Sequence, residues 1–140
     1  MKILCATDFS ASAAGAARVA ARWASKCGAR MYLVHAAHHP GAPTPSTSSA
    51  SAAAPEELRR LRALLEAQAL ELRALGAQVE VELLDGLPDE AVLARAAALG
   101  TELLVIGPIG ARSFGAFSLG SVAARLIKGS HTPVLVVREE

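Results

Sequence analysis

The chain has 140 residues, of which 52% are hydrophobic and 19% are charged, and its formal net charge is +1. This size and composition are typical of one folded domain, which we expect to span residues 1–140. A net charge so close to zero argues against nucleic acid and anionic membranes as partners, and no apolar run approaches the roughly 18–20 residues that a membrane span needs.

Apolar runs and helical patterns alternate along the chain. In order, they predict a strand at residues 3–6, a helix over about 12–26, a strand at 31–35, a helix over about 56–75, a strand at 79–84, a helix from about 88, a strand at 103–106, a helix after 120 and a strand at 134–137. The run at 79–84 alternates with glutamates, which predicts an edge strand. The other strands are continuously apolar, as in sheets that are covered on both faces.

A glycine follows each predicted helix, at Gly28, Gly76, Gly100 and Gly129. Glycine adopts the left-handed conformation that ends a helix at little steric cost, and a strand follows each one within a few residues. This repeated order predicts βαβ units, and therefore an α/β fold with an open, doubly wound, Rossmann-like parallel sheet and helices on both faces.

Residues 40–55 interrupt this order with proline, serine, threonine and alanine. Such a composition predicts a flexible loop. Two interpretations stay open, which are plain disorder and a lid or partner contact over the site.

Two loops carry candidate binding residues. Asp8 follows the first strand, ahead of a helix that Ser10 or Ser12 could cap. Its carboxylate either accepts hydrogen bonds from a ribose hydroxyl or an amino group, or closes the turn. In a doubly wound sheet, ligands bind beyond the carboxyl ends of the strands, where the strand order reverses.

The second loop lies between the strand at 103–106 and the last helix. It begins with Gly107-Pro108-Ile109-Gly110 and ends with Gly120-Ser121. The first N–H groups of a helix have no intrahelical partner, so this arrangement suits an anion. Alternatively, the glycines only shape turns, because a G-x-x-G spacing alone is weak evidence.

Other residues that invite a functional interpretation are assigned structural roles. His35, His38 and His39 have no cysteine or acid at zinc-like spacing, so no metal site is expected. Cys5 lies on a predicted strand and should be buried and inert. The chain has only two cysteines, so a disulfide framework is not expected, and reduced thiols in the cytoplasm are. Trp23 is expected to be a packing residue of the first helix. No catalytic residue is predicted.

Several segments together resemble the universal stress protein family. They are Thr7-Asp8-Phe9-Ser10, Leu33-Val34-His35, the pattern G-x2-G-x9-G-S from Gly107 to Ser121, and the final Pro133-Val134-Leu135-Val136-Val137. The resemblance covers nearly the whole chain, with the 40–55 segment as the variable part. The glycine pattern resembles that of the ATP-binding branch.

The resemblance implies a sheet of strand order 3-2-1-4-5 with an adenine nucleotide at the junction of strands 1 and 4. Asp8 would contact adenine or ribose, and Ala6 and Thr7 would line the base site with their backbone. Ala36 would offer backbone hydrogen bonds to adenine. The ligand would be ATP, ADP or AMP, with or without Mg²⁺.

The resemblance also assigns the sugar and phosphate contacts. Ile106 and Gly107 would pack beside the sugar. The phosphates would be cradled by Gly110, Gly120, Ser121 and Val122. The protein would be a homodimer joined through its last strand, from Val134 to Val137, and a nucleotide-dependent regulator or sensor of the stress response with at most slow ATP hydrolysis.

The glycine loop departs from the family pattern. Pro108 and Ile109 stand where polar or basic residues are common, which weakens the expected hold on phosphate. Arg112 either reaches a phosphate or is a solvated surface residue. Phe114 and Phe117 are either core or an exposed patch for a partner.

Two other functions compete with nucleotide sensing. One is a protein-interaction module that binds no nucleotide. The other is an adenylating enzyme, but its Ser-Gly-Gly-type loop is missing after the first strand, where the chain has residues 8–11 instead.

Overall fold

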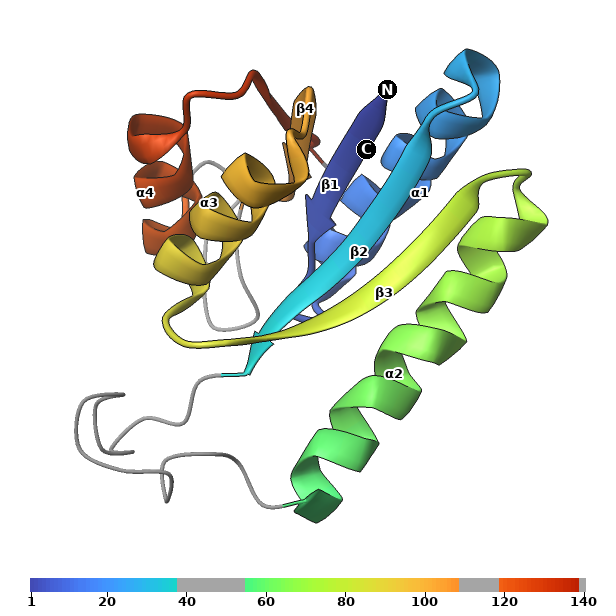
Figure 1. Cartoon of the computed structure of the whole chain (residues 1–140), viewed down its shortest axis with the longest axis horizontal. Helices are drawn as coiled ribbons and strands as arrows, with labels where there is room; N and C mark the ends of the chain where they lie inside the picture. Colours follow the sequence, from blue (N-terminus) through green and yellow to red (C-terminus); the bar gives the residue numbers. More distant parts are fainter. Residues whose placement is uncertain (38–54, 109–118, 139–140) are drawn as a thin grey trace.

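The computed structural model describes residues 1–37, 55–108 and 119–138. Its five parallel strands form one sheet in the order β3-β2-β1-β4-β5 (Figure 1). The elements are β1 (Lys2–Ala6), α1 (Ala11–Cys27), β2 (Arg30–Ala37), α2 (Pro55–Ala74), β3 (Gln78–Asp85), α3 (Pro88–Leu99), β4 (Leu103–Ile106), α4 (Ser121–Gly129) and β5 (Val134–Val136). The predicted α/β fold and its strand order are confirmed. The 40–55 loop lies almost wholly outside the described residues.

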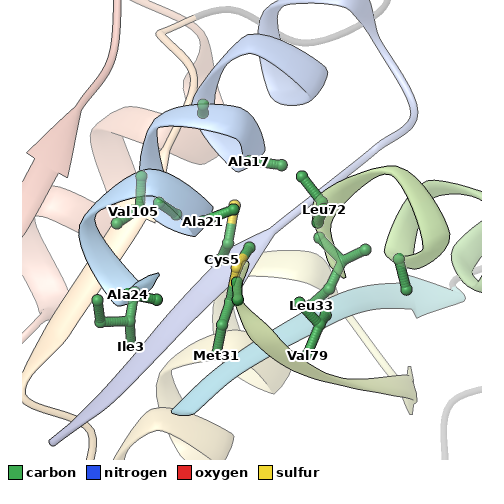
Figure 2. Packing of buried hydrophobic residues seen from close by; sticks show 14 of the residues in the cluster. Ile3, Cys5, Ala17, Ala21, Ala24, Met31, Leu33, Leu72, Val79 and Val105 are labelled. Atoms are coloured by element: carbon green, nitrogen blue, oxygen red, sulfur yellow. The ribbon is translucent and has the colours of Figure 1, made fainter. Parts of the chain in front are cut away.

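Each central strand is buried on both faces, because its side chains alternate between two helical layers. One cluster, which we call the α1–α2 face, contains Ile3, Cys5, Met31, Leu33 and Val105 with residues of α1 and α2. Figure 2 shows Ala17, Ala21 and Ala24 of α1 and Leu72 of α2 in this cluster. The other cluster, the α3–α4 face, contains Leu4, Tyr32, Val34, Leu104 and Ile106 with residues of α3 and α4.

The alanines of α1 allow this helix to lie close to the sheet. Ala16, Ala20 and Ala21 are fully buried. Ser10 caps the start of the helix, since its Oγ accepts a hydrogen bond from the Ala13 N–H at 3.1 Å. Of the two predicted capping residues, Ser10 is therefore the cap, and Ser12 is buried in the first turn.

The strand β3 is an edge strand, as its alternating pattern predicts. Its glutamates are paired with arginines of neighbouring elements. Glu82 accepts two hydrogen bonds of 2.6 Å from Arg95 of α3, and its hydrogen bonding raises the pKa of the Arg95 guanidinium. Glu80 lies 3.4 Å from Arg30 of β2.

Three of the four glycines that follow helices adopt the predicted left-handed conformation, with φ values of 67° at Gly28, 96° at Gly76 and 66° at Gly100. The prediction is wrong for Gly129, which is the last residue of α4 and is followed by an extended Ser130. A Cβ atom at Gly129 would lie 2.7 Å from Cδ1 of Leu93 in α3. The end of the Leu93 side chain therefore lies against Gly129, where α3 and α4 meet.

The expectation that Trp23 packs is also wrong, because its side chain is 45% exposed. The stripe of α1 that faces the sheet consists of alanines, and the close approach that they allow leaves no room for an indole. Trp23 lies beside that stripe. None of the helices in the described part of the chain has the length and apolar composition needed to cross a membrane.

Two leucines of α2 provide a test of this core. Leu65 is fully buried, whereas Leu70 on the same helix is 66% exposed. We expect Leu65→Ala to lower the free energy of unfolding by about 2–5 kcal/mol, since it removes packed methyl groups and leaves a cavity. Leu70→Ala should change it by less than about 0.5 kcal/mol. Urea denaturation measures both values, and equal losses would contradict this assignment of the core.

Candidate functional site

The strands β1 and β4 lie side by side, but the chain leaves them toward opposite faces of the sheet. The helix α1, which follows β1, covers the α1–α2 face, and α4, which follows β4 in the chain, covers the α3–α4 face. The register pairs Cys5 with Val105, so the two strands end together. This junction is the point of strand-order reversal at which ligands bind in such folds.

A chain of hydrogen bonds shapes the loop after β1. The Thr7 N–H donates to the Val34 carbonyl at 2.8 Å, and the Phe9 N–H donates to Thr7 Oγ1 at 3.0 Å. The Ser10 N–H donates to Asp8 Oδ1 at 3.0 Å, so Asp8 does close the turn. Because a carboxylate has about four acceptor positions, this bond is compatible with a ligand contact as well.

Phe9 holds an unusual backbone conformation in this loop. Its φ of 65° is left-handed, and in the described residues it is the one residue other than glycine with a positive φ. That conformation costs a residue with a Cβ atom roughly 1–2 kcal/mol. Such strain persists only where surrounding contacts maintain it, and it is concentrated at functional sites.

Gly107 brings the end of β4 against the first turn of α1. A Cβ atom at this position would lie 3.0 Å from both the carbonyl carbon and the carbonyl oxygen of Ser12, and closer still to Ser12 Oγ. The close packing of the end of β4 against the first turn of α1 therefore requires a glycine at this position. Ser12 Oγ is buried, with no hydrogen-bond partner in the described part of the chain.

The base of the glycine loop is closed by a backbone hydrogen bond. The Gly120 N–H donates to the Pro108 carbonyl at 2.7 Å. Gly120 is the N-cap of α4, and the Ala124 N–H makes the first helical bond, to the Gly120 carbonyl, at 2.9 Å. The N–H groups of Ser121 and Val122 precede that bond, so they lie at the positive end of the helix.

Pro108 thus has a role that its sequence position did not indicate. Proline lacks an N–H, but the Pro108 carbonyl accepts the hydrogen bond that joins the two ends of the loop. Gly110, Arg112, Phe114 and Phe117 lie outside the described residues.

Ala36 lies at the end of β2, beyond the last rung that β2 forms with β1. That ladder ends with the pair Ala6 and Val34. Since backbone groups of alternate residues in a strand point to the same side, Ala36 presents its N–H and carbonyl to the side of Val34 that meets the β1 loop. The side chain of Ala36 is buried.

The nine predicted site residues within the described ranges thus form one group at the carboxyl edge of the sheet. Ala6, Thr7 and Asp8 come from the end of β1, Ile106 and Gly107 from the end of β4, Gly120, Ser121 and Val122 from the start of α4, and Ala36 from β2. Sequence reasoning missed Ser12 as a contact of Gly107, and no local pattern marks it.

Within the described ranges, no three side chains of histidine, cysteine, aspartate or glutamate cluster closely enough to hold a metal. Burial raises the pKa of the Cys5 thiol to about 12, so it is a neutral core residue at physiological pH.

Sequence comparison places these features in a known family. The model of the universal stress protein family matches residues 1–138. A universal stress protein of Thermus aquaticus is 34% identical over 137 residues, which cover 97% of each chain. A universal stress protein of Methanocaldococcus jannaschii is 38% identical over 64 residues, which are 46% of this chain and 38% of that protein.

Solved structures agree with this comparison. A universal stress protein in complex with cAMP has a TM-score of 0.76 and 26% identity, over 99% of this chain and 96% of that one. A universal stress protein of Archaeoglobus fulgidus in complex with dAMP has the same TM-score and identity, over 99% and 98% of the two chains.

Two glycines test the contact between β4 and α1. Gly107→Ala should lower the free energy of unfolding by about 1–3 kcal/mol, because the new methyl group would overlap the Ser12 backbone. Gly15, inside α1, has only Arg18 Nη2 at 4.0 Å from its Cβ position. Gly15→Ala should therefore stabilise the protein by roughly 0.5–1 kcal/mol. Thermal unfolding compares the two, and a harmless Gly107→Ala would contradict the close contact.

Proposed function

This chain belongs to the universal stress protein family, and we propose that it binds an adenine nucleotide at the junction of β1 and β4. The observation that supports this most is the convergence of the Asp8 turn and the N-terminus of α4 at one edge of the sheet. Related structures contain cAMP and dAMP, which share the adenine base and a phosphate.

In this proposal, the base and sugar are bound by the ends of the strands. Asp8 is exposed at the turn and accepts a hydrogen bond from a ribose hydroxyl or from adenine. The backbones of Ala6 and Thr7 line the base, and Ala36 offers its N–H and carbonyl to the adenine edge. Ile106, with Gly107, packs beside the sugar.

The phosphates, in turn, are bound at the start of α4. The N–H groups of Ser121 and Val122, together with the Ser121 hydroxyl, donate to phosphate oxygens, and the helix dipole favours their negative charge. Gly110 continues this cradle, and Arg112 adds a charge-assisted bond. The Gly120 N–H is bonded to Pro108, so the cradle depends on the donors that follow it.

The ligand in this proposal is ATP, ADP or AMP, with or without Mg²⁺. The protein acts in the cytoplasm as a nucleotide-dependent regulator or sensor of the stress response. The described site offers no paired acid and base for fast turnover, so hydrolysis is at most slow.

We further propose a homodimer joined through β5. This strand lies at the edge of the sheet, and its odd-numbered residues bond to β4, as the bonds from Leu104 to Pro133 and from Val137 to Ile106 indicate. The backbone groups of Val134 and Val136 therefore point outward. An open apolar edge of this kind pairs readily with a second strand.

Calorimetric titration tests nucleotide binding. We expect Mg-ATP to bind the wild-type protein, and Asp8→Ala to weaken binding roughly tenfold or more. Asp85→Ala is the matched control, since Asp85 ends the edge strand β3 and is also exposed. No binding of millimolar ATP, ADP or AMP to the wild type would favour the interaction module that binds no nucleotide.

Gly120→Asn tests the phosphate cradle. The backbone of Gly120, with φ −63° and ψ 157°, suits any residue, and asparagine is a preferred N-cap. Its side chain would accept a hydrogen bond from the N–H of Val122 or Ala123 and so occupy phosphate donors. We expect thermal stability to be kept or raised while ATP binding is lost. Unchanged affinity would contradict the cradle.

Light scattering tests the dimer. Val136→Pro removes an outward N–H of β5 without removing a bond to β4, and proline is tolerated on edge strands. We expect the wild type to be a dimer at micromolar concentration and the variant to be a monomer with the same far-UV circular dichroism. A monomeric wild type would contradict the proposal.

A further inference from the structure

We propose that His35 is a positioning residue for the adenine end of the site. Its imidazole takes the place of the next rung between β1 and β2 and, together with Phe9, fixes the Asp8 turn. This inference rests on the proposed function and adds two residues to it that are not assigned to the ligand itself.

The side chain of His35 bonds to the backbone of Thr7. His35 Nδ1 lies 2.7 Å from the Thr7 carbonyl oxygen. A carbonyl oxygen only accepts hydrogen bonds, so Nδ1 carries the proton. The half-buried imidazole of β2 therefore donates to the first residue after β1.

This bond replaces a backbone hydrogen bond of the ladder between β1 and β2. The Thr7 N–H donates to the Val34 carbonyl at 2.8 Å, as in a parallel ladder. In a regular ladder, the Thr7 carbonyl would then accept the N–H of Ala36. In the described chain, this carbonyl accepts from the imidazole instead, and the Ala36 N–H makes no backbone bond to Thr7. The bond from His35 thus ends the ladder between β1 and β2, and the Ala36 N–H remains as a hydrogen-bond donor beside the Asp8 turn.

The ring of His35 also contacts the ring of Phe9. Their ring centroids are 4.6 Å apart with an interplanar angle of 43°. Phe9 packs against the α1–α2 face, whereas Asp8, the residue before it, is exposed. The left-handed φ of Phe9, 65°, returns its ring to the sheet directly after Asp8 has turned outward. The ring contact and the bond from the Phe9 N–H to Thr7 Oγ1 maintain this conformation.

Two His35 variants separate positioning from general stability. Asparagine places its amide nitrogen as many bonds from Cα as Nδ1 of histidine, whereas glutamine places it one bond further away. We expect His35→Asn to keep the dissociation constant of AMP within about threefold of wild type, and His35→Gln to raise it roughly tenfold. Both should unfold at similar temperatures. Adenosine should show the same ratio, because the effect lies at the adenine end.

Amide hydrogen exchange tests the same inference without nucleotide. The Phe9 and Ser10 N–H groups both bond within the turn. We expect their exchange to be roughly tenfold faster in His35→Gln than in the wild type and unchanged in His35→Asn. If the wild type binds no AMP, the proposed function fails, and exchange alone decides whether His35 holds the turn.

A pair of Phe9 variants tests the backbone of the turn. Both lose the ring contact, but asparagine tolerates the left-handed conformation and valine does not. We expect faster exchange at Ser10 and weaker AMP binding in Phe9→Val than in Phe9→Asn. Wild-type exchange and affinity in both His35→Gln and Phe9→Val would overturn the inference.

Discussion

The parallel pairing of β1 with strands on both of its sides is the constraint from which the rest of the site follows. Ile3, Leu4 and Cys5 are fully buried, and the strand pairs with β2 on one side and β4 on the other. Because the chain leaves β1 and β4 toward opposite faces, the carboxyl ends of these two strands meet at the point where the strand order reverses. Each loop of the site is anchored to this strand or to its neighbours.

Three close contacts then fix the positions of the loops at this junction. Gly107 meets the backbone of Ser12, Pro108 accepts the Gly120 N–H, and His35 donates to Thr7. The contacts of Gly107 and His35 join segments that are far apart in the sequence, and the bond to Pro108 joins the two ends of one loop. Together they hold one acidic turn and one helix start at a common edge, which is the arrangement on which the proposed nucleotide binding rests.

Pro108 shows why the chemistry of a single residue is an incomplete guide to this site. The N–H that it lacks predicts a weaker hold on phosphate, yet its carbonyl closes the glycine loop. The opposite holds for Gly120, whose expected N–H contribution to the cradle is already engaged in the same bond. For Asp8, the hydrogen bond from the Ser10 N–H shows that its carboxylate closes the turn, and its proposed ligand contact would add to that role.

The sequence by itself determined the order of strands and helices, the burial of the central strands and the edge position of β3, since these depend on periodicity and on local helix ends. The match to the family then supplied the strand order. Only the tertiary structure decided that Gly129 is a helix–helix contact, that Trp23 is exposed and that Gly107 fits against Ser12. These outcomes depend on the distance between elements, which side-chain volumes on both partners set together and no single segment encodes.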